Sequence, residues 1–456
     1  MLMDRLRYRR RSDGSGAPLW TMPAAAIVLA LVLGASLSRI RVAPGSLLDA
    51  IAFKGTEGDA RQLLAVVAGT MITVTSLVFA LTVATLQIAS TQYSPRLLRS
   101  FLRDHGTLLV MSVLVGTDAY SLAGLQGVGS SGGGTVPRLA VSGALLLALL
   151  SVAVLVFYVG HMTNAIQIDT IMQRVEQTAR RLLHHDHPVA GGNGLDPDDS
   201  QAPPIPGHAV VVAAPRDGYL QGVNSRALVP MLERHDLIAR VLPLVGYHVV
   251  EGEPLAAVWH DDARALSSAE LDAVAAAILL LPERLAELDI GFDIRQLVDM
   301  ANRAMGTTQN DPYTAVQAVH HLTAVLNDAA RRSFTSRQLL DAAGRLRVTI
   351  SIMDFPTHLN VVCGHVRKGG SERHPRVTLE LLRLLGAVAV SSVGERRRSA
   401  VERELDAVLA DARRTLPPGD DLEEMERTAT QARARLELGR SGPARGRLGA
   451  AGHPQL

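Results

Sequence analysis

The stretch QLLAVVAGTMITVTSLVFALTVATLQIAS, residues 62–90, contains no charged side chain and decides the architecture of the first third of the chain. About 20 helical residues cross the hydrocarbon core of a bilayer, so a helix over this stretch is long enough to span it and to project beyond it. We therefore predict an integral membrane protein.

Small and polar residues recur along this helix at steps of three and four, which places them on one face. This seam consists of Gly69, Thr73, Ser76, Ala80, Ala84, Gln87, Thr91 and Ser94. Thr and Gln side chains are not stabilised by contact with lipid, so we expect the seam to face another helix or water. Two interpretations remain open: close helix–helix packing through small residues, or the lining of a pore or cavity.

Three further segments, residues 19–40, 107–128 and 139–158, are apolar enough to span a bilayer, which gives four predicted spans in all. Five arginines lie in the basic segment 1–18, and three more lie between the second and third spans. The positive-inside rule then places both termini in the cytoplasm. The abundance of arginine, alanine and glycine favours a bacterial source, so we expect the protein in the inner (plasma) membrane. A cleaved signal peptide is the alternative for the first span, but no clean small-x-small cleavage site follows Leu33.

The segment between the second and third spans carries Arg96, Arg99 and Arg103 on one face and leucines on the other. A short basic amphipathic helix of this kind would lie in the cytoplasmic interface, with its arginines near anionic headgroups. A helical connector whose arginines only set the topology predicts the same placement.

Asp118 is the only carboxylate well inside any of the four apolar segments. A carboxylate at that depth costs about 2.5 kcal/mol or more unless it faces water, is protonated or has a partner. Asp118 is therefore a candidate functional residue. The alternative is a small shift of the third span that brings it close to the outer interface.

The composition restricts the partners of the protein. The formal net charge is only +2, so there is no bulk basicity to attract nucleic acid, and the expected partner is the lipid bilayer. Cys363 is the only cysteine, which excludes an intrachain disulfide and a Cys-rich zinc or iron–sulfur site.

Beyond residue 166 the chain becomes polar. We predict a helical extension and linker over residues 167–207, a small β-rich domain over 208–261, a mainly helical domain over 262–438 and a disordered tail over 439–456. The short strand-like runs of the β-rich domain suggest a barrel or sandwich, and apolar residues at helical spacing then recur through Leu288. The predicted fold is an α-helical membrane protein with four transmembrane helices, followed by a cytoplasmic α+β region of a small β-barrel-like domain plus helices.

The most distinctive polar pattern of the predicted cytoplasmic region is a charged ladder. Arg295, Asp299 and Arg303 are spaced at i, i+4 and i+8, which places them on one helix face. Asn310 and Asp311 precede Pro312, so Asp311 is the expected N-cap of the next helix. A salt-bridge network and a structural cap are the favoured interpretations, with a ligand site as the alternative.

Catalytic motifs are scarce. The run His184-His185-Asp186-His187 has metal-ligand chemistry but ends a helix beside a linker, and His358, Cys363 and His365 are spaced at i, i+5 and i+7, which separates them on a helix. The sequence contains no Gly-x-Ser-x-Gly, no phosphate loop and no His-Glu-x-x-His. We expect no enzyme, no metal and no cofactor.

Several separate motifs resemble one family in the same order along the chain. They are Thr73-Val74-Thr75-Ser76-Leu77-Val78-Phe79, Gln92-Tyr93-Ser94-Pro95-Arg96-Leu97-Leu98, Phe101-Leu102-Arg103-Asp104, Gly218-Tyr219, Gly252-Glu253-Pro254-Leu255, Arg295-Gln296-Leu297-Val298-Asp299 and Asn310-Asp311-Pro312. In these the chain, from about Leu19 to Arg414, resembles the bacterial predicted membrane proteins grouped as domain of unknown function 2254. Two departures are Gly306-Thr307-Thr308-Gln309 before Asn310, where the family tends to a Ser-Pro-Gly-type turn, and Asp118, where it tends to be apolar. The resemblance implies four spans and a cytoplasmic domain, and it implies no activity.

Two classes of function fit these features. In the first, protomers form a homo-oligomer in which the second span lines a central conduit, as in a channel-like or mechanosensitive-type assembly with a cytoplasmic vestibule. In the second, the spans are an anchor for a cytoplasmic module that binds a ligand or a protein. The oligomeric state separates them, because a pore of one helix per protomer needs about five or more copies.

Overall fold

The computed structural model describes residues 20–40, 52–92, 105–128, 136–190, 203–284, 289–306, 310–369 and 373–440, with only the backbone described for residues 88–92, 163–166 and 439–440. The chain divides into an N-terminal unit, Met1–Ile171, and a C-terminal unit, Met172–Leu456.

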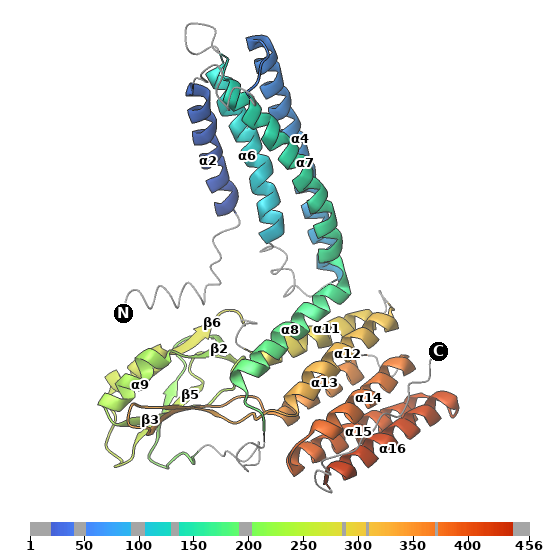
Figure 1. Ribbon diagram of the computed structural model, residues 1–456. Coiled ribbons are helices and arrows are strands. Elements are labelled where there is room, and N and C mark those ends of the chain that lie inside the picture. The colour runs from blue at the N-terminus through green and yellow to red at the C-terminus, as the bar shows by residue number, and fades with distance from the viewer. Residues whose placement is uncertain are drawn as a thin grey trace. The chain divides into compact units, whose positions relative to one another are not determined.

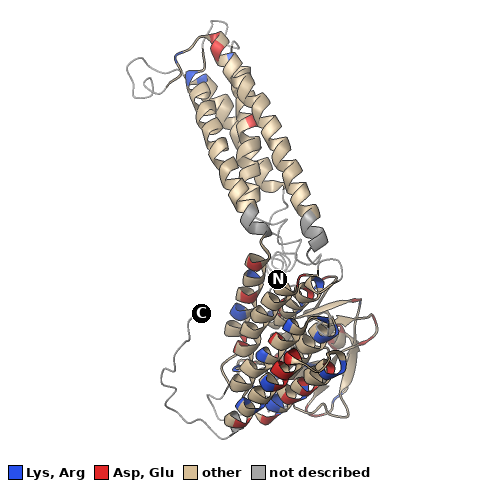
Figure 2. Cartoon of the chain, turned by 90° about the vertical axis from the view of Figure 1, so that its right-hand side faces the viewer, with Lys and Arg blue, Asp and Glu red and all other residues tan. Residues whose placement is uncertain are grey.

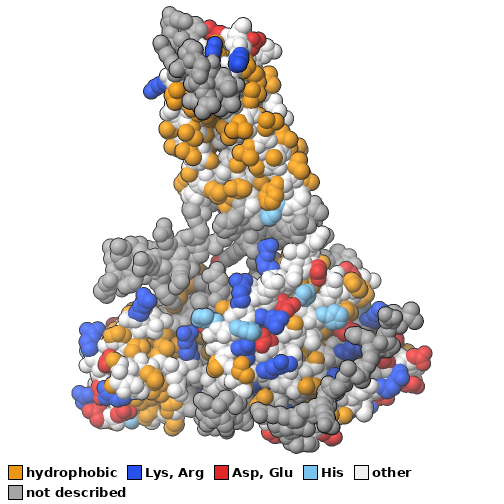
Figure 3. Space-filling view, viewed as in Figure 1, with side chains coloured by type: hydrophobic (Ala, Val, Ile, Leu, Met, Phe, Trp, Pro, Cys, Tyr) orange, Lys and Arg blue, Asp and Glu red, His pale blue; other side chains and the backbone are white. Residues whose placement is uncertain are grey.

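The N-terminal unit contains four long helices: α2 (Thr21–Arg39), α4 (Glu57–Gln92), α6 (His105–Gly127) and α7 (Arg138–Ile166) (Figure 1). All four are long and apolar enough to cross a membrane, which confirms the four apolar helices that the sequence predicts. Charged side chains are scarce between their ends, whereas the helices of the C-terminal unit carry many of both signs (Figure 2). Apolar side chains are spread over the face of these helices that Figure 3 shows, and many large apolar residues of all four helices are exposed.

Helix α4 begins at Glu57, before the predicted start at Gln62. The backbone N–H of Thr56 donates to Asp59 Oδ2 at 2.8 Å, and the backbone N–H of Asp59 donates to Thr56 Oγ1 at 3.3 Å. This reciprocal cap satisfies N–H groups of the first turn, where acidic side chains also interact favourably with the helix dipole. The charged first turn is therefore part of the helix, although it is not part of the apolar run.

Helix α6 lies against the other three helices and is the most buried of the four. Thr117 and Ser151 share a hydrogen bond of 3.0 Å between α6 and α7, and Thr82 and Tyr158 share one of 2.6 Å between α4 and α7. Such interhelical hydrogen bonds and small residues are the usual means by which membrane helices associate.

Strands occur only in the C-terminal unit among the described residues. They are β1 (Val210–Ala213), β2 (Gly218–Val223), β3 (Leu237–Val241), β4 (His248–Val249), β5 (Pro254–His260), β6 (Ile278–Leu281), β7 (Arg337–Leu340) and β8 (Leu346–Ile350). They form a five-stranded sheet in the order β1-β5-β3-β8-β7 and a three-stranded sheet in the order β4-β2-β6. Among the described residues the strands form two open sheets and no closed barrel, so the prediction of a barrel-like domain is wrong, whereas the predicted strand content is present.

The larger sheet is completed from a distant part of the sequence. Strand β3 pairs with β5 on one side in antiparallel fashion and with β8 on the other in parallel fashion, with Ala239 opposite Val348. A parallel neighbour needs a long crossover connection, and here more than 100 residues separate the two strands. The sequence pattern of residues 208–261 does not indicate that a strand from beyond this range pairs with β3.

Strand β6 corrects a second expectation. The helical spacing through Leu288 predicts that the apolar run Ile278–Leu281 continues a helix. Instead, helix α10 (Ser268–Ala277) ends before this run, which forms a strand that pairs with β2. A short continuous apolar run is compatible with either a buried helix or a buried strand, so periodicity alone does not decide. Ser267 and Glu270 form a capping box at the start of α10.

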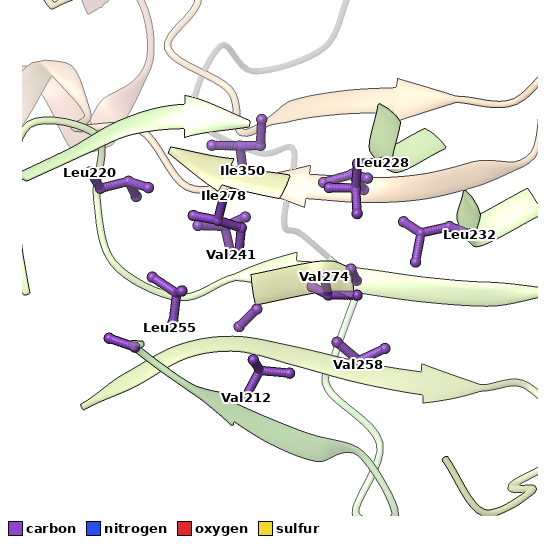
Figure 4. Packing of buried hydrophobic residues seen from close by; sticks show 14 of the residues in the cluster. Val212, Leu220, Leu228, Leu232, Val241, Leu255, Val258, Val274, Ile278 and Ile350 are labelled. Atoms are coloured by element: carbon purple, nitrogen blue, oxygen red, sulfur yellow. The ribbon is translucent and has the colours of Figure 1, made fainter. Parts of the chain in front are cut away.

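The sheets and the two short helices α9 (Ser225–Arg234) and α10 enclose one apolar core (Figure 4). Leu220 and Ile278 come from the smaller sheet, Val258 and Ile350 from the larger one, and Leu228 from α9. Burial of these aliphatic side chains stabilises the arrangement, by about 25 cal/mol for each Å² of apolar surface removed from water.

The rest of the C-terminal unit is helical: α8 (Ile168–Asp186, which begins just before the boundary between the units), α11 (Ile290–Ala304), α12 (Pro312–Ala329), α13 (Phe355–Lys368), α14 (Pro375–Ser391), α15 (Glu395–Thr415) and α16 (Asp420–Arg440) (Figure 1). Helix α12 packs between α11 and α14, and α14 packs in turn against α16. The sequence predicts these helices, with α8 as the helical extension that follows the spans.

Candidate functional site

The seam of α4 lies on the outer face of the four-helix unit. Its six members with described side chains are all exposed: Gly69, Thr73, Ser76, Ala80, Ala84 and Gln87. A Cβ atom placed on Gly69 would meet no other atom within 4 Å. Thr91 lies in the backbone of α4, but its side chain is outside the described residues, as is Ser94.

Close packing inside the unit uses other small residues. A Cβ atom on Gly34 of α2 would lie 2.8 Å from the carbonyl oxygen of Tyr120 in α6, and one on Gly143 of α7 would collide with the Tyr120 hydroxyl group. These glycines let neighbouring backbones approach within the protomer. Among the described residues the seam has no such partner, so it is available to a helix of another protomer.

The seam hydroxyl groups are already hydrogen-bonded within their own helix. Thr73 Oγ1 donates to the carbonyl oxygen of Gly69 at 3.1 Å, and Ser76 Oγ donates to that of Ile72 at 2.8 Å. Back-bonded Ser and Thr need no external acceptor, so they tolerate an apolar neighbour, and they retain lone pairs that water can use.

Asp118 lies on α6 and is partly buried. Its Oδ1 atom is buried without a hydrogen-bond partner among the described residues, and so are Tyr120 Oη and Thr75 Oγ1 of the same unit. A carboxylate in an apolar helix bundle is costly unless it is neutral or reaches water or a cation. Asp118 therefore remains a candidate functional residue. The basic segment with Arg96, Arg99 and Arg103 lies outside the described residues.

The charged ladder lies on α11. Arg295, Asp299 and Arg303 are all half-buried, and each interacts with other groups of the protein. The ion-pair network predicted between them stays a prediction.

The predicted cap of α12 is confirmed. Asp311 Oδ1 accepts the backbone N–H of Thr314 at 3.2 Å, and its Oδ2 accepts the Thr314 hydroxyl group at 2.6 Å. These hydrogen bonds lower the pKa of Asp311. Asn310 precedes the cap with a φ of 45°, in the left-handed region that asparagine tolerates better than most residues.

The histidine-rich end of α8 does not converge on one point. His184 Nε2 lies 2.8 Å from Asp328 Oδ2 of α12, whereas His187 Nδ1 lies 3.1 Å from the carbonyl oxygen of Ser333, and the His187 ring stacks on Phe334. In the described part of the chain, no three His, Cys, Asp or Glu side chains are grouped as metal ligands would be. Cys363 is fully buried in α13.

A buried charged cluster that the sequence interpretation missed surrounds the start of α11. Asp289 caps this helix by accepting the backbone N–H of Gly291 at 2.8 Å, and it also accepts a hydrogen bond of 2.5 Å from Arg284 Nε. A Cβ atom on Gly291 would lie between 3.0 and 3.3 Å from Asp289, Arg284 and His358, so these three side chains meet at one place.

Asp293 is the most unusual member of this cluster. It is only 2% exposed, and its Oδ2 atom has no hydrogen-bond partner among the described residues. Its pKa is raised to about 8, mainly by burial and also by the nearby Asp289, while Arg181 acts in the opposite direction. At neutral pH the Asp293 carboxyl group is therefore protonated.

The neighbouring His358 is shifted in the opposite sense. It is 2% exposed, its ring lies edge-on to Phe334, and its Nδ1 atom has no hydrogen-bond partner among the described residues. Burial lowers the pKa of His358 to about 3, so the ring is neutral. The cluster therefore holds two buried groups that are uncharged at pH 7 beside the ion pair of Arg284 and Asp289.

The sequence does contain a signal for the burial of Asp293. Ile290, Ile294 and Leu297 form an apolar stripe at helical spacing, and position 293 lies on that same stripe. An acidic residue on the apolar face of a helix therefore indicates a buried carboxyl group.

Comparison with known proteins assigns the chain to a family. A family model described as "Predicted membrane protein (DUF2254)" matches residues 17–387. The chain belongs to this family. Uncharacterised proteins of Mycobacterium bovis and Mycobacterium tuberculosis are 39% identical over 407 residues, which covers 88% of this chain and 78% of each relative. No solved structure matches the chain.

The span matched to DUF2254 contains the four apolar helices, the seam, Asp118, the charged ladder and the buried cluster. Helices α15 and α16 lie beyond its last residue, 387. The resemblance predicted from separate motifs is thus confirmed, and this chain is a DUF2254 protein.

Proposed function

We propose that this DUF2254 protein forms a homo-oligomeric, channel-like assembly in which the seam of α4 faces the other protomers or the conduit that they enclose. The supporting observation is the exposure of all six described seam residues, together with the open space beside Gly69. The unit satisfies its internal packing through other glycines, which leaves the seam available.

The chemistry of the seam fits this role. Small residues let two helices approach closely, and in lipid this gain in van der Waals contact is the main driving force for helix association. Closed rotational symmetry would bring one α4 helix from each protomer to a common axis. Thr73, Ser76 and Gln87 would then offer oxygen atoms along that axis, which is the chemistry of a permeation path.

Thiol cross-linking tests the proposal directly. Cys363 is buried and is the only cysteine, so a Cys363→Ala background allows single cysteines to be introduced. Ser76→Cys should give oxidative cross-links between protomers in the membrane. Leu81→Cys is the matched control, because Leu81 is also exposed, at 44%. It lies five residues after Ser76, which places it about 140° around the helix from that position.

A second measurement separates a pore from a packed interface. A membrane-impermeant, charged thiol reagent should modify Ser76→Cys if the seam lines a water-filled conduit, and the particle mass in nanodiscs should correspond to about five or more copies. A monomeric particle without seam cross-links would contradict the proposal and favour the anchor with a ligand- or protein-binding module.

A further inference from the structure

We infer that the groove between α14 and α16 binds a phosphate-bearing anion. This inference concerns only the C-terminal unit and does not depend on the proposed assembly. The groove encloses about 460 Å³, which is within the range of small-molecule sites. Its walls carry three arginines, Arg383 of α14 and Arg427 and Arg435 of α16.

The floor of the groove is built by small residues. Gly386 of α14 lies against Ala432 of α16, and a Cβ atom on Gly386 would lie 3.4 Å from both Ala432 Cβ and Arg435 Nη1. The Arg435 guanidinium group therefore lies across the surface of α14 at the point where a side chain is missing. The two helices form a depression there, with a cation lying across it.

The charges in the groove are unevenly balanced. Arg383 pairs with Glu380 at 2.6 Å and with Glu424 at 3.1 Å. Among the described residues no carboxylate pairs with Arg427 or Arg435, although Arg427 Nε donates to the carbonyl oxygen of Glu423 at 3.4 Å.

Other arginines on or beside α16 differ in this respect. Arg433 pairs with Asp406 of α15, and Arg413 of α15 pairs with Glu426 of α16. Among the described residues, the groove thus contains two arginines without a carboxylate partner, Arg427 and Arg435, and Glu424 is the only acid in its lining.

The spacing of the two arginines limits the ligand. Residues 427 and 435 are eight positions apart, so their backbones are separated by about 12 Å along the helix axis. Guanidinium groups bind phosphate in a planar, bidentate manner. Two arginines whose backbones are this far apart suit an extended anion with more than one phosphate group. Gln431 and Thr428 lie between them and supply polar groups to such a ligand.

Titration of the full-length protein with tripolyphosphate tests the inference. In nanodiscs of phosphatidylcholine we expect saturable binding by calorimetry, and the double variant Arg427→Ala/Arg435→Ala should weaken it at least tenfold. Arg433→Ala is the matched control, because it removes one arginine of α16 that lies outside the groove lining and should leave the affinity unchanged.

A second arm distinguishes a soluble ligand from a lipid headgroup with the same chemistry. In nanodiscs that contain cardiolipin, unchanged tripolyphosphate binding indicates a soluble ligand, and competition by the lipid indicates a headgroup; either result supports a phosphate site. Absence of saturable binding in phosphatidylcholine, or equal weakening in Arg433→Ala, would overturn it. If the double variant does not fold, Arg435→Gln alone takes its place in the same comparison.

Discussion

The buried Asp293 predicts an unusual dependence of stability on pH. The perturbation is Asp293→Asn, which keeps the shape of the side chain but removes its ability to ionise. Asp293 is 2% exposed with a pKa of about 8, whereas a carboxyl group in an unfolded chain titrates near 4. Between these values the folded state holds one proton more than the unfolded state, so the free energy of unfolding falls as the pH rises through this window.

His358 acts in the opposite direction over a lower range. Its pKa is about 3 in the folded protein, and a histidine in an unfolded chain titrates near 6.5, so its contribution to stability rises with pH between these values. From about pH 4 to 6.5 the two effects offset each other. Between about pH 6.5 and 8 only Asp293 contributes, at about 1.4 kcal/mol for each pH unit, which gives a loss of roughly 2 kcal/mol for the parent protein.

The assay can use the two tryptophans of the chain. Trp259 is buried in strand β5 of the C-terminal unit, so a Trp20→Phe background leaves a fluorescence signal from that unit alone. Denaturant unfolding in nanodiscs at pH 6.5 and 8 should show the loss in the parent and its absence in Asp293→Asn. Asp262→Asn is the control, because the pKa of Asp262 is lowered and it is ionised throughout this range. The same pH slope in Asp293→Asn as in the parent would refute the assignment.

The remaining predictions concern the four-helix unit and use measurements in membranes. Thr73→Phe on the seam should reduce the oligomer mass or the conductance, whereas Leu81→Phe, about 80° around the helix from Thr73, should have a milder effect; equal effects of the two substitutions would show that the seam has no special role. Asp118→Asn should reduce cation preference or shift the pH dependence of currents in bilayer recordings without loss of protein, and unchanged currents would leave Asp118 as an interfacial residue. A reporter fused after Gly207 should read cytoplasmic and one inserted near Ser131 exterior; an exterior reading after Gly207 would contradict the predicted topology.

The four apolar helices could be predicted from the sequence because their length and apolarity are local properties that a bilayer selects directly. Their ends were predicted less well. Helix α4 begins in a charged turn that is stabilised by the cap of Thr56 and Asp59, so apolarity alone misses its first residues. The cap at Asp311 was found because a capping side chain and a following proline are also local signals.

The arrangement of the sheets depends on pairing between strands that are far apart in the sequence, and local sequence patterns do not predict this pairing. Strand β8 lies more than 100 residues after β3, and nothing in either strand identifies the other as its partner. The expectation of a barrel assumed that neighbouring strands complete each other, whereas β6, β7 and β8 all come from beyond residue 261. A pattern of period two predicts strands, but it does not predict which edges meet.

The candidate sites also differ in how far the sequence alone predicts them. The seam is visible in the sequence because helical spacing alone defines a face, but only the packed structure shows that this face is exposed while Gly34 and Gly143 carry the internal contacts. Asp293 looks like an ordinary acid in the first turn of a helix, where acids are common. Its chemistry arises from the elements packed around it, since burial and the neighbouring Asp289 together keep it protonated near pH 7. A titratable residue on an apolar stripe is thus the feature that connects sequence pattern to site chemistry in this chain.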